Sequence, residues 1–517
     1  MKATSPTASN LRDCGLICQG YLRLNTTYLL APRLEPRMST VPTPHNVAAT
    51  VATEAFFAMP VVMELGNLFE ASGFEIAIVG GPVRDVLLDR EIHDLDFTTN
   101  ATPEQIITVV EPWADTVWDV GIEFGTVGVR KGDFFAEITT YRSEAYDTES
   151  RKPEVSFGSS LIDDLVRRDF TINAMAVRIP SGEFVDPFGG IDDLMKKLIR
   201  TPREAELSFS DDPLRMMRAA RFASQLEFTL VADVIIAATD MAARISIVSA
   251  ERVRDELSKL LLGKNPRLGL EILEGTKISD LILPELPALQ LEIDEHHRHK
   301  DVYEHSLIVL EQAIDLETSH VPNLEPDLVL RLAALLHDIG KPKTRRFESG
   351  GGVSFHHHEV VGAKLVRKRL AALRYSNDVI DDVSKLIELH LRFHGYGEGQ
   401  WTDAAVRRYV RDAGDQLARL HKLTRADCTT RNQRRALMLA ATYDDLEQRI
   451  AELQEQEELN SIRPALDGNE IMQILGIKPS REVGVAYDYL LNKRLDEGPM
   501  ARDRAIELLH EWWATRS

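Results

Sequence analysis

The chain has 517 residues, a formal net charge of −20 and 44% hydrophobic residues. This length exceeds what one hydrophobic core supports, so we expect several domains. The acidic balance argues against indiscriminate coating of nucleic acid, no apolar run approaches the ~18 residues that span a membrane, and three cysteines are too few for a disulfide framework. We therefore expect a cytoplasmic protein with no membrane partner, and composition leaves its oligomeric state open.

The first part of the chain predicts no fold of its own. Residues 1–54 are rich in Ser, Thr, Pro and Ala and lack sustained periodicity, which predicts a disordered N-terminal tail. Charged residues such as Arg12 and Arg23 interrupt each apolar stretch, which argues against a signal peptide. Met38 is an alternative start.

The pattern then becomes mixed α/β from 55 to 200. A helical period begins at Ala55, a strand is expected at 74–79, and a second strand ends at Phe97. Residues 126–130 and 134–141 predict a hairpin. After this block the chain is almost wholly helical, and composition shifts divide it into 201–293, 294–435 and 436–517.

Two carboxylates, Asp94 and Asp96, carry the strongest chemical signal. Residues i and i+2 of a strand point to the same face, and carboxylates held side by side repel each other unless a cation lies between them. A pair of Mg²⁺ ions, and hence nucleotidyl transfer by two metals, is the chemistry that this arrangement favours. Glu137, on the expected strand at 136–138, is a candidate third carboxylate.

A glycine turn precedes these carboxylates. Gly80 and Gly81 let the backbone approach a triphosphate without an intervening side chain, and Pro82 lies where a helix would begin. Arg84 can neutralise phosphate charge. A glycine pair is more often only a turn, but its conjunction with the carboxylates is much less common by chance.

The chain resembles the class II nucleotidyltransferases, a family of CCA-adding tRNA nucleotidyltransferases and bacterial poly(A) polymerases. The resemblance runs in order from about residue 75 to residue 260. It is carried by the runs Gly80-Gly81-Pro82-Val83-Arg84-Asp85, Asp94-Leu95-Asp96, Arg167-Arg168-Asp169-Phe170-Thr171-Ile172-Asn173-Ala174, Asp186-Pro187-Phe188-Gly189-Gly190, Asp212-Pro213-Leu214-Arg215 and Glu251-Arg252-Val253-Arg254-Asp255-Glu256.

The resemblance implies roles for these residues. The glycine run, with Asp85, would hold the nucleotide's phosphates. Ribose and phosphates would be bound by Arg167, Arg168 and Asp169, with Asn173 close by. The incoming base would be read by Asp212 and Arg215.

Spacing and hydrogen-bond chemistry agree with base reading by Asp212 and Arg215. The two residues lie three apart and would share a helix face. An arginine donor and a carboxylate acceptor match the edges of cytosine and adenine, whereas uracil and guanine present a ring N–H to the donor. Arg218 and Arg221 continue this face and would reach phosphate. The alternative is that these arginines only make salt bridges on a surface helix.

Two activities share these motifs. The run 121–129 looks like the CCA-adding pattern, whereas poly(A) polymerases of this branch carry a basic run there. The segment 141–157 resembles the family's flexible loop, which is associated with the switch from C to A addition. The alternative is that segment 141–157 is an ordinary surface loop without this role.

A second constellation downstream resembles the HD phosphohydrolase domain. Its expected ligands are His305, His337, Asp338, His358, His390 and Asp427. The alternatives are His356 or His357 in place of His358, and His394 in place of His390. Such a set can hold one or two divalent metals, with Mn, Ni, Co or Fe as candidates. The domain would hydrolyse a phosphoester such as a 2′,3′-cyclic phosphate, or only dock tRNA.

We predict an α+β chain: a mixed α/β nucleotidyltransferase head (55–200), a helical neck and body (201–293), an HD domain (294–435) and a helical tail (436–517). It would add CCA to tRNA from CTP and ATP, using Mg²⁺. tRNA would be held by shape and backbone, with the basic run from Arg407 to Arg435 as a candidate contact. The alternatives are a poly(A) polymerase, a signalling hydrolase acting through the HD domain, and a tRNA-binding protein without catalysis.

Overall fold

The structure is a computed structural model that describes residues 44–92, 94–118, 122, 125–145, 154–157, 160–290, 301–349, 352–395, 401–430, 432–457 and 462–516. Most of the predicted tail lies outside these residues. So do positions 146–153 of the predicted flexible loop, and 121, 123 and 124 of the run compared with CCA-adding enzymes.

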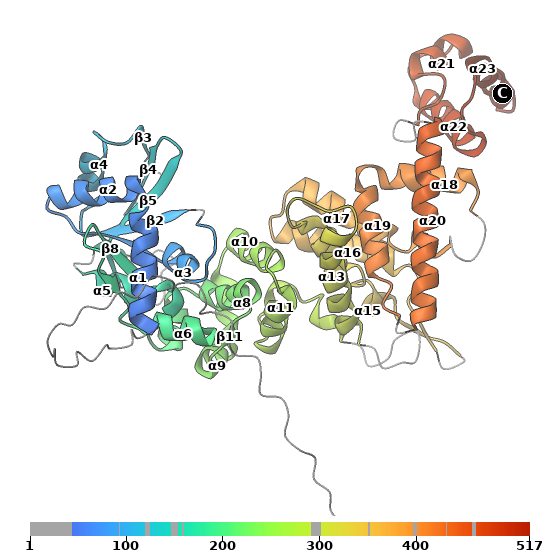
Figure 1. Ribbon diagram of the computed structural model, residues 1–517. Helices are drawn as coiled ribbons and strands as arrows, with labels where there is room; N and C mark the ends of the chain where they lie inside the picture. The colour runs from blue at the N-terminus through green and yellow to red at the C-terminus, as the bar shows by residue number, and fades with distance from the viewer. Residues whose placement is uncertain are drawn as a thin grey trace, which may run out of the picture. The chain divides into compact units, whose positions relative to one another are not determined.

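The head is built on one seven-stranded sheet with the order β3-β4-β5-β2-β1-β8-β9. Figure 1 labels β3, β4, β5, β2 and β8 of this sheet. Neighbouring strands are antiparallel except β2 and β5, which are parallel. The strands are β1 (Ile76–Val79), β2 (Leu95–Thr99), β3 (Thr116–Trp118), β4 (Thr126–Lys131), β5 (Phe134–Thr140), β8 (Ala176–Ile179) and β9 (Phe184–Val185). The predicted hairpin is confirmed as β4 and β5, and a separate pair is formed by β6 (Arg142–Ala145) and β7 (Glu154–Phe157).

One face of this sheet carries the head's main core. Alternate residues such as Phe97, Val127 and Ile138 are buried there, as the two-residue period of a strand requires. The helices of the head are α1 (Pro44–Phe57), α2 (Pro60–Ala71), α3 (Gly81–Leu87), α4 (Pro103–Val110), α5 (Leu161–Val166) and α6 (Gly190–Lys196). On the opposite face, α5 packs over β1 and β8 through Leu161 and Leu165.

The predicted tail boundary at residue 54 is wrong. Helix α1 begins at Pro44, and Ala52 and Phe56 are fully buried in the head core. The segment 1–54 was expected to be disordered because it is rich in Ser, Thr, Pro and Ala, but its last residues supply apolar side chains to the head core. Within the described residues no single helix is long and apolar enough to cross a membrane, and only α1 with α2, bent by 94°, meets that test as a pair.

The rest of the chain is helical, as predicted, and one continuous core spans the neck and the HD domain. The neck helices are α7 (Ala205–Asp211), α8 (Leu214–Leu226), α9 (Ala232–Asp240), α10 (Ala250–Leu261), α11 (Pro266–Gly275) and α12 (Ser279–Ile282). The helices of the HD region are α13 (Val302–Ser319), α14 (Leu328–Leu336), α15 (Lys341–Thr344), α16 (His358–Ala372), α17 (Asn377–Leu389), α18 (Asp403–Ala413), α19 (Leu417–Ala426) and α20 (Gln433–Glu457). Short strands β10 (Leu198–Ile199), β11 (Thr229–Leu230), β12 (Arg346–Phe347) and β13 (Val353–Ser354) form two small pairs.

The boundary predicted at 435 divides a helix that belongs to the HD core. Tyr443, Leu446, Ile450 and Leu453 of α20 are buried in the same core as the HD helices. A separate apolar cluster forms further on, from α21 (Gly468–Leu475), α22 (Arg481–Glu497) and α23 (Arg502–Ala514). The high charge of α20 suggested a helix outside the HD domain. Its apolar residues form only a narrow stripe, which the charged residues made hard to recognise in the sequence.

Candidate active site and metal cluster

Two of the carboxylates predicted to hold metal, Asp96 and Glu137, lie on one face of the head sheet, and Asp94 lies just before it. Asp96 on β2 is the register partner of Glu137 on β5, so both side chains lie on the same face. Asp94 is exposed and lies just before β2, which begins at Leu95. Burial raises the pKa of Asp96, the Arg168 guanidinium lowers it, and the charges of Glu137 and Asp94 raise it, leaving it above its ordinary value. A divalent cation would relieve this repulsion.

The glycine turn lies at the end of the neighbouring strand, β1. Gly80 has φ +78° and ψ −132°, a conformation that residues with a side chain rarely adopt. A Cβ at this position would lie 2.9 Å from Nη1 of Arg168. The turn therefore brings bare backbone against a guanidinium that also acts on Asp96, which is a suitable setting for phosphate groups.

The two arginines of the Arg-Arg-Asp run are held by Asp164, a carboxylate that sequence reasoning missed. Its side chain is fully buried and accepts from Nε and Nη2 of Arg167, at 3.0 and 2.5 Å, and from Nη2 of Arg168 at 3.1 Å. Burial raises the pKa of Asp164, but the two guanidinium groups outweigh it and leave the pKa below its usual range. The spacings of three and four residues from Asp164 on α5 to the two arginines that follow the helix are the signal that could have revealed it.

Asp169 and Asn173 connect the glycine turn with the neck. Arg84 pairs with Asp85 and also donates to Oδ1 of Asn173 at 2.7 Å. Asn173 donates to Oδ1 of Asp169 at 2.9 Å, and Oδ2 of Asp169 accepts from Nε of Arg218 at 2.9 Å. Burial raises the pKa of Asp169, but Arg218 and the Asn173 hydrogen bond hold it well below its usual range. The carboxylate is thus occupied in positioning its neighbours.

The prediction that Asp212 and Arg215 share one helix face is wrong. Asp212 lies between α7 and α8 in an extended conformation, because the residue before Pro213 is kept out of the helical region. Its carboxylate accepts from Nη2 of Arg252 at 2.7 Å. Arg215 is on α8, nearly buried, and donates to the carbonyl of Arg167 at 2.6 Å. The pair is linked only through backbone, from Arg215 N–H to the Asp212 carbonyl, at 3.0 Å.

The arginine ladder also differs from prediction. Arg218 is bound to Asp169, and Arg221 donates through Nε to Glu256 of α10 at 2.6 Å. Glu256 is buried and also lies 3.4 Å from Arg218. Internal carboxylates therefore neutralise the guanidinium groups of Arg218 and Arg221. This arrangement corresponds to the alternative stated above, a helix whose arginines make salt bridges. Sequence reasoning quoted Glu256 in a motif without giving it this role.

All six predicted HD ligands lie in one cluster. Two groups of possible metal ligands are each compact within 4.8 Å: His305, His337 and Asp427, and Asp338, His358 and His390. The groups adjoin, since His337 Nε2 lies 3.2 Å from Asp338 Oδ2 and 3.3 Å from His305 Nε2. Lys341, one turn after Asp338, lies 2.8 Å from the same Oδ2 atom.

Three of the histidines are oriented by the same local device. Nδ1 of His337, His358 and His390 lies 2.9, 2.8 and 2.6 Å from the backbone carbonyl three residues earlier. An Nδ1–H that donates to a carbonyl leaves the Nε2 lone pair facing inward. Burial and the charge of His337 lower the pKa of His390 to about 3, so that its ring is neutral.

The donor atoms of this cluster suit a cation, and one of them is buried without a partner in the part of the chain that the structure describes. Within the described residues, His390 Nε2 is buried without a hydrogen-bond partner. Asp338 Oδ2 faces Lys341 and His337, and His358 Nε2 lies 3.2 Å from Asp338 Oδ1. Burying an unpartnered polar atom is costly unless something satisfies it, and nitrogen with carboxylate oxygen is the donor set of a divalent transition metal. Of the alternatives, His356 and His357 are exposed, and the side chain of His394 lies outside the described residues.

The basic run at 407–435 is largely engaged within the protein. Arg407 donates to the carbonyl of Leu495 at 3.1 Å, and Arg408 pairs with Asp496 at 2.5 Å. Lys422 donates to the carbonyl of Val321 at 2.8 Å. These three side chains are engaged within the protein, and the contact of the run with tRNA stays a prediction.

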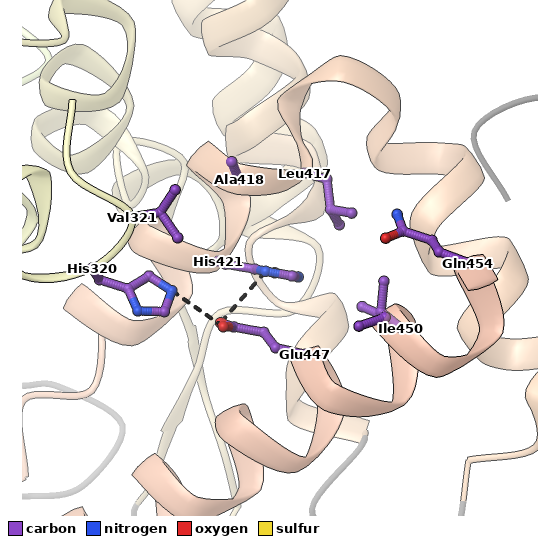
Figure 2. A pocket seen from close by; sticks show the side chains of 9 residues that line it. His320, Val321, Leu417, Ala418, His421, Glu447, Ile450 and Gln454 are labelled. Atoms are coloured by element: carbon purple, nitrogen blue, oxygen red, sulfur yellow. Dashed lines mark ion pairs between the residues drawn. The ribbon is translucent and has the colours of Figure 1, made fainter. Parts of the chain in front are cut away.

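A pocket of about 210 Å³ lies where α20 meets the HD helices. Figure 2 shows His320 and His421 both turned toward Glu447 of α20, at 3.2 and 3.5 Å. Arg425 also pairs with Glu447, at 2.9 Å. The pocket shares no residue with either cluster above, and its carboxylate is fully used in holding α20 to the domain.

The comparisons with known proteins agree with this geometry. Residues 76–200 match the model of the poly A polymerase head domain, 227–289 the probable RNA and SrmB-binding site of polymerase A, and 302–432 the HD domain. The chain is 44% identical over 223 residues to a CCA-adding enzyme of Lactobacillus helveticus, covering 43% of this chain and 54% of the relative. It is 43% identical over 222 residues to one of Enterococcus faecalis, covering 43% and 52%. The matched region therefore spans about half the length of these curated relatives.

Solved structures extend the likeness along most of the chain. The CCA-adding enzyme of Bacillus stearothermophilus in complex with CTP has a TM-score of 0.64 at 26% identity, over 88% of this chain and 97% of that one. The Thermotoga maritima CCA-adding enzyme complexed with tRNA shares the fold, with a TM-score of 0.57 at 18% identity over 91% and 98%.

The fold and the carboxylate site define a protein with a nucleotidyltransferase head of the poly(A) polymerase type and a C-terminal HD domain. Its head and the segment after it match poly(A) polymerase models, and the chain is similar over most of its length to a solved CCA-adding enzyme.

Proposed function

We propose that this protein adds CCA to the 3′ end of tRNA, using CTP and ATP and releasing pyrophosphate. The observation that carries the proposal is the placement of Asp94, Asp96 and Glu137 beside the glycine turn. The relatives named above are CCA-adding enzymes, which favours this activity over poly(A) synthesis. A cytoplasmic location is part of the proposal, since the chain has too few cysteines for a disulfide framework.

Each part of the head has a role in this proposal. Asp94 and Asp96 hold Mg²⁺, which when bound lowers the cost of activating a hydroxyl and of releasing pyrophosphate. Glu137 lies beside Asp96 and supplies the third carboxylate. The turn at Gly80 and Gly81 leaves backbone free for phosphate oxygens, and Arg168 lies against it.

The neck supplies base selection in the same proposal. Arg215 is anchored to the carbonyl of Arg167, which places it next to the ribose- and phosphate-binding run. Asp212 reaches the nucleotide from the segment before α8, and its partner Arg252 is half exposed and can give way to a base. The two then meet the edge of cytosine or adenine without sharing a helix.

The test is incorporation of single nucleotides. Purified protein is incubated with tRNA lacking its 3′ CCA and with CTP, ATP, GTP or UTP alone, then with CTP and ATP together. We expect CTP to add two residues, the pair to complete CCA, and GTP and UTP to give no product. Long A tails without any C would contradict the proposal. Asp94→Ala and Asp96→Ala abolish incorporation, whereas His337→Ala, outside the head, retains it.

A second activity is supported by the HD cluster. We propose that its six ligands hold one or two divalent transition metals such as Mn, Ni, Co or Fe, because their donor atoms converge in two adjoining groups and His390 Nε2 is buried without a partner among the described residues. The substrate class is a phosphoester, with a 2′,3′-cyclic phosphate as the first candidate. Hydrolytic opening of the cyclic ester to a 2′- or 3′-phosphomonoester, measured with each metal in turn, tests it. His337→Ala should abolish this ring opening and Asp94→Ala should not.

A further inference from the structure

Trp118, Gly128, Glu137 and Asp96 lie in one row across the head sheet. Trp118 on β3 is the register partner of Gly128 on β4, Gly128 of Glu137 on β5, and Glu137 of Asp96 on β2. Register partners project to the same face of a sheet. The indole of Trp118 therefore lies on the same face as the carboxylates, opposite the core that receives Val117.

The indole extends across the sheet toward the carboxylates. A Cβ at Gly128 would overlap the Trp118 ring, so the indole occupies the space above β4 that a side chain would otherwise fill. Gly128 is the only residue between Trp118 and Glu137 in this row. Trp118 is partly exposed rather than buried in a core. It thus presents an aromatic surface directly beside the third carboxylate.

The adjacent row adds a second aromatic ring and a positive charge. Arg130 on β4 and Phe135 on β5 are register partners, and both lie an even number of residues from the row above, hence on the same face. Phe135 is 53% exposed, and the Arg130 guanidinium is 6.0 Å from its ring centroid. Exposed aromatic rings interleaved with arginine are the features that bind single-stranded nucleic acid.

The strand order decides which substrate lies here. The glycine turn follows β1 on one side of β2, whereas β5, β4 and β3 lie on the other side. In an in-line displacement, the attacking oxygen approaches from the side opposite the leaving pyrophosphate. With the triphosphate at the glycine turn, the attacking 3′-hydroxyl comes from the side of β3.

We propose that Trp118, Phe135 and Arg130 bind the 3′-terminal nucleotides of the RNA primer, the rings by stacking on bases and Arg130 by contacting phosphate. This inference rests on the proposed function. Stacking accepts any base because every base has a π face. Such tolerance suits a primer whose last base changes after each addition, whereas hydrogen-bond readout would favour one primer over the next.

The test compares variants of the full chain on tRNA lacking CCA. Trp118→Ala should raise KM for tRNA about 10-fold, in line with the usual worth of one stacked base, and leave KM for CTP unchanged. Trp118→Phe keeps a ring and should stay within about 3-fold of wild type. Phe135→Ala removes a side chain that is already 53% exposed and should raise the same KM without loss of folding. Thr116→Ala, on the same strand and face but without a ring, is the matched control.

The outcomes separate this inference from the proposed function. Filter binding gives the Kd for tRNA of each variant without catalysis, and thermal melting shows that each is folded. Folded Trp118→Ala and Phe135→Ala variants with wild-type tRNA affinity would overturn the inference, as would a rise in KM for CTP alone. If wild-type protein incorporates neither CTP nor ATP, the proposed function fails, while the Kd comparison still decides whether this face binds RNA.

Discussion

Replacing Asp164 by Asn should weaken the binding of nucleotide, although Arg167 and Arg168 themselves are unchanged. The carboxylate is fully buried and accepts three hydrogen bonds from Arg167 and Arg168. An asparagine keeps the shape and one acceptor oxygen but removes the negative charge. Two guanidinium groups then face a neutral amide, and they repel each other without a counter-ion.

The magnitude follows from burial. Removing one partner of a buried ion pair costs about 3–5 kcal/mol. The side chains of Arg167 and Arg168 are 17% and 21% exposed, so water replaces part of the lost partner. We therefore expect a loss of about 2 kcal/mol in the free energy of unfolding. We expect KM to rise about 10-fold for CTP and ATP alike, since ribose and phosphates are common to both.

The measurement is single-nucleotide kinetics with each substrate, together with urea unfolding. Asp163→Asn is the matched control, because Asp163 is the exposed neighbour and its carboxylate contacts only Ser160 among the described residues. The control should lose less than about 0.5 kcal/mol. If Asp164→Asn behaved like the control, or raised KM for only one nucleotide, Asp164 would not be the residue that positions both arginines.

Further predictions concern acid stability, metal content and packing. Burial raises the pKa of Asp169, but Arg218 lowers that pKa well below the usual range. The contribution of Asp169 to stability is therefore complete above about pH 4 and is lost as the pH falls below that value. In urea unfolding, Asp169→Asn should be less stable than wild type at neutral pH but should lose less stability between about pH 4 and pH 2. Asp338→Ala should lower the Mn²⁺ bound after dialysis of the full chain, measured by elemental analysis, whereas Asp96→Ala should retain the tight fraction. Gly128→Ala should push Trp118 aside, lower the free energy of unfolding by about 1–3 kcal/mol and raise KM for tRNA; wild-type values for both would contradict the overlap.

The head could be predicted from sequence because its signals are local. A two-residue apolar period identified β4 and β5, and the glycine pair marked the turn at Gly80. The Asp94–Asp96 spacing placed two carboxylates on one side of the chain before any partner strand was known. The pairing of Glu137 with Asp96 needed the register of β2 with β5, and only strand order determines that register.

The neck was less predictable because its charges find partners far along the chain. Arg218 and Arg221 read as ligands for phosphate until Asp169 and Glu256 are placed beside them. The junction of α7 and α8 is a second example. The spacing of Asp212 and Arg215 predicted one shared helix, but Pro213 keeps Asp212 out of α8. For α1 the sequence predicted disorder where the structure has a helix, because its small apolar residues pack against the head sheet.

The buried charges of the neck are connected to the glycine turn. Arg84, Asn173 and Asp169 form a continuous hydrogen-bonded chain from the glycine turn to Arg218, and Arg218 reaches Glu256 on α10. Each link is a charge-assisted or buried bond, so a shift of the neck helices is transmitted to the turn. Asp94 and Asp96 are outside this chain and keep one geometry for either substrate. If the protein adds both C and A as proposed, we expect the choice between them to depend on Asp212 and Arg215 of the neck rather than on the metal-binding carboxylates.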